Sequence, residues 1–198
     1  MIKEPFVIGI AGAVGSGKSW FAGKLKDALS VPVCLFTLDI YSKDEFFVNG
    51  LEYHYDNPLA IDYDKAYLDF TKLTQGETIK LPVYDYVTHS VVSEITYSSP
   101  LVIIIEGLYA FFDKRFVDAM DFKIWIEADE KTCMERRIKR DIAERGESRE
   151  DSTNRHYKDS KPAYEKFYKS GYLLADSIYF NSFDDNPPKI IDILIKVV

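Results

Sequence analysis

The chain has 198 residues, a length that suits one α/β domain with a small appendage. Asp and Glu total 32 against 25 Lys and Arg, and the net charge of −7 excludes a broad electrostatic interaction with nucleic acid. Cys34 and Cys133 lack metal-ligand spacing and lie in apolar or helical stretches, which is typical of reduced cytosolic cysteines. The apolar residues before the first glycine-rich stretch are too few for a signal peptide or a membrane span. We therefore expect a soluble, cytoplasmic protein that binds neither nucleic acid nor membrane.

The first half of the chain alternates between strand and helix patterns. Apolar, β-branched stretches predict strands at 6–11 and 33–39, and apolar residues at helical spacing predict helices over 18–30 and 63–74. Asp62 is expected to cap the second helix, and Gly76 to end it. Segments 78–82 and 93–98 then have the pattern of two arms of a hairpin.

The second half returns to the same alternation. The expected elements are strands at 101–107 and 122–128, a long helix over about 129–145, and final strands at 177–180 and 190–198. Residues 148–151 resemble a capping box that starts a new helix after Gly146. This order predicts one parallel sheet flanked by helices, to which the hairpin and an Arg-rich helical segment are added.

The sequence GAVGSGKS at 12–19 matches the phosphate-binding pattern G-x-x-x-x-G-K-[ST] and lies between a predicted strand and a predicted helix. Its glycines let successive backbone N–H groups turn inward, while the helix N-terminus adds partial positive charge. Lys18 can neutralise β- and γ-phosphate oxygens, and the Ser19 hydroxyl can ligate Mg²⁺. A glycine-rich turn that only packs would not need Lys and Ser at these offsets. We expect a nucleotide to bind Gly12, Ala13, Val14, Gly15, Ser16, Gly17, Lys18 and Ser19.

Two predicted strands end in carboxylates. Asp39 is the last residue of the strand predicted at 33–39, and Glu106 lies at the end of the most apolar strand, predicted at 101–107. Open parallel sheets bind ligands at the edge where their strands end, so one carboxylate can serve a metal while the other accepts a proton. The alternative for each is a solvated carboxylate at a strand end.

Seven segments, taken in order, resemble the uridine kinase group of the phosphoribulokinase and uridine kinase family. They are GAVGSGKS, LDIYSKD (38–44), YDNPLAID (55–62), PVYDYVTHS (82–90), IIIEGLYAF (103–111), RRIKRDIAERG (136–146) and KPAYEKF (161–167) with the later AD. Many NTPases share the phosphate loop, but the combination in this order is far more specific. It covers residues 8 to about 180.

The resemblance implies a P-loop NTPase fold in a single kinase domain over 1–198. Its parallel five-stranded sheet would have the order 2-3-1-4-5 and be flanked by helices, with a β-hairpin insertion at about 77–98 and an Arg-rich helical lid at about 136–158. The implied activity is ATP- or GTP-dependent transfer of the γ-phosphate, with Mg²⁺, to the 5′-hydroxyl of uridine or cytidine. The partner would be a small, nucleoside-like substrate, and assembly into a homo-oligomer stays open.

The resemblance also implies roles for individual residues. Asp39 would be the base near the acceptor hydroxyl, and Ser19 with Glu106 would hold Mg²⁺. The acceptor site would include Asp56 on the ribose hydroxyls, Tyr84 and His89 at the nucleobase, and Arg137. The phosphates would be met by Lys18, Arg137, Arg140 and Arg145 as the lid closes and excludes water.

Structural alternatives remain for the arginines and for the hairpin residues. Arg137 with Asp141, and Arg140 with Glu144, have the i,i+4 spacing of ordinary surface ion pairs. Arg136 and Lys139 are assigned to the solvated face of their helix. Tyr84 and His89 could pack along the hairpin for cohesion instead of facing a base.

The chain departs from the uridine kinase pattern at two positions. Val91 stands where that group usually has arginine, and Glu147 replaces the second arginine of its Arg-Gly-Arg lid sequence. Arg149 and Arg155 lie near enough in sequence to compensate. The acceptor could therefore be another nucleoside, a sugar phosphate or a pantothenate-like alcohol. A nucleotide-binding regulatory module without catalysis is a further alternative, although such a module would not need Asp39.

Overall fold

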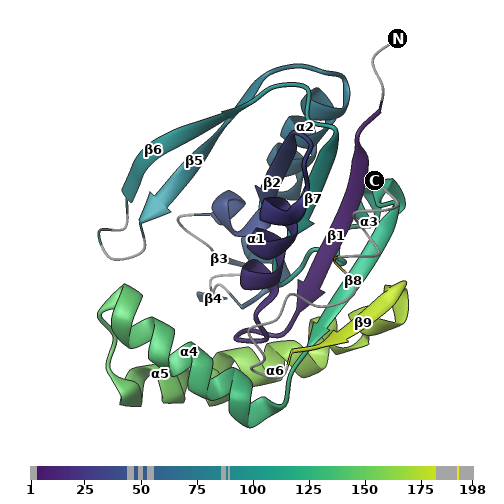
Figure 1. The fold of residues 1–198 in the computed structure, drawn as a ribbon. Coiled ribbons are helices and arrows are strands. Elements are labelled where there is room, and N and C mark those ends of the chain that lie inside the picture. The colour runs from purple at the N-terminus through teal and green to yellow at the C-terminus, as the bar shows by residue number, and fades with distance from the viewer. Residues whose placement is uncertain are drawn as a thin grey trace.

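The computed structural model describes residues 4–43, 47–48, 51–52, 56–85, 88, 90–181 and 191. Its central feature is a parallel sheet in which the strands have the order β2-β7-β1-β8-β9 (Figure 1). Their bounds are β1 Phe6–Gly12, β2 Val33–Thr37, β7 Val102–Glu106, β8 Phe122–Glu127 and β9 Ser177–Phe180. Numbered along the chain within this sheet, the order is 2-3-1-4-5, which confirms the prediction.

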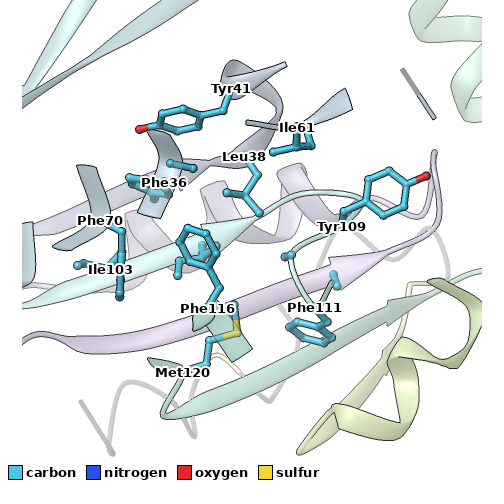
Figure 2. Close-up of a cluster of buried hydrophobic side chains, with 14 of the residues drawn as sticks. Phe36, Leu38, Tyr41, Ile61, Phe70, Ile103, Tyr109, Phe111, Phe116 and Met120 are labelled. Carbon is cyan, nitrogen blue, oxygen red and sulfur yellow. The ribbon is translucent and has the colours of Figure 1, made fainter. Parts of the chain in front are cut away.

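Helices cover both faces of the sheet. The helices are α1 Lys18–Ala28, α2 Tyr63–Thr74, α3 Lys114–Ala119, α4 Glu130–Arg145, α5 Arg149–Arg155 and α6 Lys161–Ala163. One face of β1 and β7 packs against Phe21 and Leu25 of α1. The other face packs against α2 and α3, where Phe36 of β2 lies 6.3 Å from the rings of Phe70 and Phe116 (Figure 2). Burial of these apolar side chains holds the sheet between its two helical layers.

The predicted helix ends are confirmed for α2, α4 and α5. Asp62 accepts a hydrogen bond from the backbone N–H of Lys65 at the start of α2. Gly146 ends α4 in the left-handed conformation with φ of 67°, and Ser148 caps α5 by accepting from the Asp151 N–H. Two π-helical turns, His156–Ser160 and Tyr164–Tyr168, and a 3₁₀ turn, Lys169–Leu174, continue the helical path beyond α5. Figure 1 shows these helices beyond the carboxyl ends of the parallel strands.

The hairpin consists of β5 Ile79–Asp85 and β6 Ser90–Tyr97, which pair antiparallel with a register shift between Val83 and Tyr84. Ile79 and Leu81 anchor its base in the core, whereas most of β6 is exposed. A short second pair joins β3 Phe47–Val48 to β4 Leu51–Glu52. Of the strand predicted at 190–198, only Ile191 is described, and this residue is helical, which contradicts the prediction at that position. None of the helices in the described part of the chain has the length and apolar character of a membrane span.

Candidate active site

The phosphate loop has the strand–loop–helix context that its sequence predicts. It leaves β1 at Gly12 and enters α1 at Lys18, and Gly15 and Gly17 adopt φ values of 79° and 95° that side chains disfavour. A Cβ on Gly15 would overlap the carbonyl oxygen of Cys133 in α4. The glycine at 15 is therefore required both by its own backbone and by the close approach of α4.

The loop contains two buried polar groups that fit an anion. Ser16 is fully buried, and its Oγ lacks a hydrogen-bond partner among the described residues. Lys18 is only 9% exposed and lies in the first turn of α1. A phosphate in the loop would satisfy the hydroxyl, neutralise the ammonium group and meet the positive end of the helix.

Ser19 and Glu106 meet at the carboxyl edge of the sheet. The Ser19 hydroxyl donates a 3.0 Å hydrogen bond to Glu106 Oε2, which brings together two oxygen ligands from α1 and β7. No group of three or more His, Cys, Asp or Glu side chains with metal-binding geometry occurs in the part of the chain that the structure describes. The two oxygens of the Ser19–Glu106 pair fit Mg²⁺, because this ion typically takes one or two protein oxygens and completes its shell with phosphate oxygens and water.

Asp39 lies beside this pair. Leu38 and Tyr41 are buried and anchor the 3₁₀ turn Leu38–Tyr41, which leaves Asp39 exposed between them. Its Oδ1 is 3.5 Å from the place that a Cβ on Gly107 would occupy, so the Asp39 carboxylate lies next to the residue that follows Glu106. The exposed carboxylate is thus placed where an acceptor hydroxyl could approach the phosphate loop.

The electrostatics of Glu106 follow from this crowding. Burial raises the pKa of its carboxyl, and the negative charge of Asp39 raises it further. Lys18 and hydrogen bonds from Ser19 and Thr37 offset part of this increase. An additional cation next to Glu106 would favour its ionised form, as a magnesium site requires.

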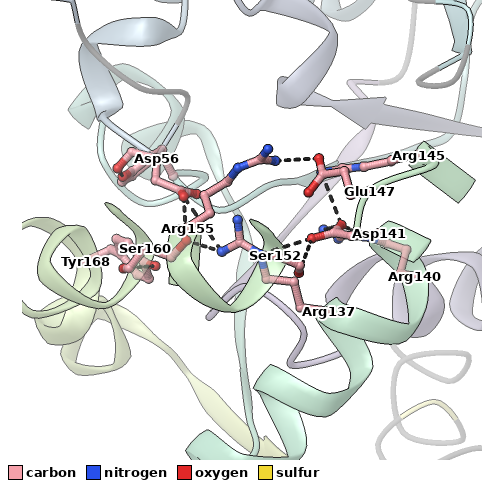
Figure 3. A network of polar contacts seen from close by, with 11 residues as sticks. Asp56, Arg137, Arg140, Asp141, Arg145, Glu147, Ser152, Arg155, Ser160 and Tyr168 are labelled. Atoms are coloured by element: carbon pink, nitrogen blue, oxygen red, sulfur yellow. Dashed lines mark hydrogen bonds and ion pairs between the residues drawn. The ribbon is translucent and has the colours of Figure 1, made fainter. Parts of the chain in front are cut away.

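Asp56 and Arg137 come together, as the prediction of a shared acceptor site requires (Figure 3). Asp56 Oδ2 accepts a 2.5 Å hydrogen bond from Ser160 and lies 3.8 Å from Arg137 Nη1. Arg137 is 3% exposed and also donates to Ser160, while the Tyr109 hydroxyl donates to the Asp56 backbone carbonyl. Sequence reasoning missed Ser160 because it contacts both residues only through the fold.

Arg140 and Arg145 converge on Asp141, as Figure 3 shows. Asp141 is fully buried and accepts from Arg140 Nη2 at 2.8 Å, while Arg145 Nη1 lies 3.4 Å from the same carboxylate oxygen. Its other oxygen accepts from Arg137 Nε at 3.2 Å and from Ser152 Oγ at 2.9 Å. The i,i+4 pair of Arg137 with Asp141 is thus present, but it is buried, unlike an ordinary surface pair.

The assignment of Arg136 to a solvated face is wrong. Its Nη1 donates to the Ser16 carbonyl, and its Nη2 donates to the Asn181 carbonyl, both at 3.2 Å. Asn181 follows β9 and also donates to the Ser16 carbonyl at 2.8 Å. No local signal marks these contacts, because the spacing of Arg136 in the sequence is that of an exposed arginine.

The expected nucleobase contacts are only partly described. Tyr84 lies on β5 with 37% of its surface exposed, opposite Val91 of β6. His89 lies outside the described residues. Glu147 stands where the family pattern has the second lid arginine. Its Oε1 lies 2.6 Å from Arg155 Nη1, so this position forms an ion pair with Arg155.

A cavity of about 270 Å³ adjoins the phosphate loop. Ala13 and Val14 line it on the loop side, and Ser160 and Tyr168 line it on the side of the π-helical turns. It therefore reaches from the predicted donor site to the residue that binds Asp56.

The chain is similar to known kinases over most of its length. Uridine kinase of Saccharomyces cerevisiae is 38% identical over 190 residues, which are 92% of this chain and 38% of the yeast protein. Uridine kinase of Streptococcus pyogenes serotype M5 is 32% identical over 183 residues, which are 90% of this chain and 88% of the bacterial protein.

The fold is similar to that of phosphoribulokinase from Rhodobacter spheroides, with a TM-score of 0.63 at 16% identity over 94% of this chain and 74% of that one. The sequence pattern of the Phosphoribulokinase / Uridine kinase family matches residues 7–181. The chain therefore belongs to the phosphoribulokinase and uridine kinase family.

Proposed function

We propose that this protein is an ATP- or GTP-dependent kinase that phosphorylates the 5′-hydroxyl of uridine or cytidine. The observation that supports this most is the meeting of Ser19, Glu106 and Asp39 beside the phosphate loop. A loop, a metal-binding pair and one orienting carboxylate are the parts that phosphoryl transfer needs. This chain spans 38% of the length of the yeast uridine kinase that it matches.

In the proposed reaction, the acceptor oxygen forms a bond to the γ-phosphorus as the bond from that phosphorus to the β,γ-bridging oxygen breaks. Asp39 accepts the hydroxyl proton, and the electron pair of the broken bond stays on the departing diphosphate. Lys18 and the N-terminus of α1 neutralise charge on the phosphate oxygens. Ser19 and Glu106 would hold Mg²⁺, which would neutralise charge on the phosphate oxygens.

Asp56 and Arg137 would bind the ribose hydroxyls, since a carboxylate accepts from a diol and a guanidinium donates to it. Ser160 holds Asp56 in place by a 2.5 Å hydrogen bond. Tyr84 offers a flat surface for the nucleobase, and we propose His89 as a hydrogen-bonding partner of the same base. Arg140 and Arg145, together with Arg137, would form the lid over residues 136–158 that excludes water during transfer.

The test is an acceptor panel assayed for ADP or GDP release with Mg²⁺ and ATP or GTP. Uridine and cytidine are expected to be turned over, with deoxyuridine weaker because it lacks one hydroxyl for Asp56. Other nucleosides, a sugar phosphate and pantothenate complete the panel. Turnover of one of these in place of uridine and cytidine would refute the proposed acceptor, and a failure of every acceptor to stimulate release would refute a kinase of this kind.

A further inference from the structure

Two side chains from different parts of the chain meet at one carbonyl group of the phosphate loop. Arg136 Nη1 donates to the Ser16 carbonyl at 3.2 Å from α4, and Asn181 Nδ2 donates to it at 2.8 Å from the end of β9. Arg136 Nη2 also donates to the Asn181 carbonyl, which ties the two donors to each other. Ser16 and Asn181 are buried, so water does not replace these donors easily.

These contacts set the orientation of one peptide group. In a trans peptide the C=O and the following N–H point in opposite directions. Because Arg136 and Asn181 hold the Ser16 carbonyl toward α4 and the end of β9, the Gly17 N–H is directed away from these two elements and left available to a phosphate. Gly17 also allows the approach, because a Cβ there would overlap Asn181 Nδ2.

The next residue along α4, Arg137, faces the proposed acceptor site. Arg137 contacts Ser160 and lies 3.8 Å from Asp56 Oδ2, whereas Arg136 contacts the phosphate loop. Successive residues on a helix point about 100° apart, so one turn of α4 contacts the loop and the acceptor side at once.

We propose that Arg136 and Asn181 are positioning residues that hold the Ser16–Gly17 peptide in the orientation needed for the donor phosphates, and thereby couple the loop to α4. The proposal rests on the proposed kinase function, because it assumes that the loop binds a nucleotide. Neither side chain needs to touch the reacting atoms. Their loss should therefore weaken nucleotide binding more than it slows the chemical step or weakens acceptor binding.

The experiment compares the full chain with the variants Arg136→Gln and Asn181→Ala. The MgADP dissociation constant is measured by calorimetry, KM for ATP and for the acceptor by ADP release, and the unfolding midpoint without nucleotide by thermal denaturation. Each variant is expected to weaken MgADP binding and raise KM for ATP by about tenfold, the effect of a hydrogen bond to a buried group. We expect kcat and the acceptor KM to stay within about threefold of the wild-type values.

Two further variants distinguish positioning from loss of charge or of stability. Arg136→Lys keeps one donor and should recover part of the lost nucleotide affinity, while Lys139→Gln removes one charge from the exposed side of the same helix and should change nothing. Unchanged MgADP binding in both test variants would overturn the inference. Equal increases in KM for ATP and for the acceptor, together with a lower unfolding midpoint, would also overturn it. Failure of the wild-type chain to bind MgADP would instead overturn the proposed function itself.

Discussion

Replacing Asp141 by asparagine should destabilise the protein far more than the same change at an exposed ion pair. The Asp141 carboxylate is fully buried and faces Arg137, Arg140 and Arg145 as well as the Ser152 hydroxyl. An asparagine side chain has the same shape, but it would carry no charge and would turn an N–H₂ group toward a guanidinium. The arginines would then repel one another without compensation.

The expected magnitude follows from these contacts. Breaking a buried ion pair by removing one partner costs about 3–5 kcal/mol. The side chains of Arg140 and Arg145 are 34% and 26% exposed and can turn partly to water, so we expect the lower end, about 3 kcal/mol. For a chain of this size, that loss lowers the unfolding midpoint by roughly 6–12 °C.

The pH dependence gives an independent check. Burial alone would raise the pKa of Asp141, but hydrogen bonds and charge from Arg140, with Ser152 and Arg145, outweigh it and lower the pKa below its ordinary value of 3.8. A lowered folded-state pKa means that the carboxylate stabilises the protein above pH 3.8 and loses this effect as the pH falls through the folded-state pKa. The difference between wild type and Asp141→Asn should therefore shrink below about pH 4.

Urea denaturation at several pH values around 4 measures the free energy of unfolding and its dependence on pH. Asp118→Asn is the control, because Asp118 forms an i,i+4 ion pair with Lys114 whose side chains are 58% and 85% exposed. This substitution should change stability by no more than about 0.5 kcal/mol. A loss at Asp141 as small as at Asp118, or one that does not depend on pH, would show that the arginines do not need this carboxylate.

Three further predictions concern the proposed active site. Asp39→Asn should lower turnover by about 10²-fold and leave MgADP binding nearly intact in calorimetry, and unchanged turnover would remove Asp39 from its role as base. Glu106→Gln should raise the unfolding midpoint of the nucleotide-free protein at neutral pH, and a lower midpoint would contradict this. The reason is that a carboxyl whose pKa is raised in the folded protein destabilises the fold above its ordinary pKa, because it ionises more easily in the unfolded chain. The same substitution should abolish the magnesium-dependent stabilisation by ADP. Gly15→Ala should weaken MgADP binding by at least about tenfold because its Cβ would overlap the Cys133 carbonyl, whereas Gly23→Ala in α1, with no atom near its Cβ, should stabilise the protein by about 0.5–1 kcal/mol in thermal unfolding.

The sheet and the phosphate loop could be predicted because each depends on local sequence. Period and composition place the strands, and the loop pattern is contiguous, so both are visible without any tertiary contact. Asp39 and Glu106 could be predicted as neighbours for a related reason, since parallel strands end at the same edge of a sheet.

The partners of the arginines could not be predicted in the same way. Arg136, Arg137 and Arg140 share a helix and a chemistry, yet one contacts the phosphate loop, one is buried beside Asp56 and one binds Asp141. The i,i+4 spacing of an ion pair is the same in the sequence whether the pair lies on the surface or in the core. Burial of Asp141 depends on Ser152 of α5, whose position depends in turn on the turn at Gly146.

The position of β1 in the sheet has a consequence for biosynthesis. β1 is the first strand of the sheet to leave the ribosome, but both of its neighbours come late, since Phe6 pairs with Val102 of β7 and Ile8 with Phe122 of β8. About half of the chain must therefore be translated before this apolar strand can find its first hydrogen-bonded neighbour. Until then α1 can cover only one face of β1, so the apolar side chains of the other face stay exposed on the nascent chain, where chaperones can bind them. Nascent chains that stall before residue 102 should therefore be aggregation-prone.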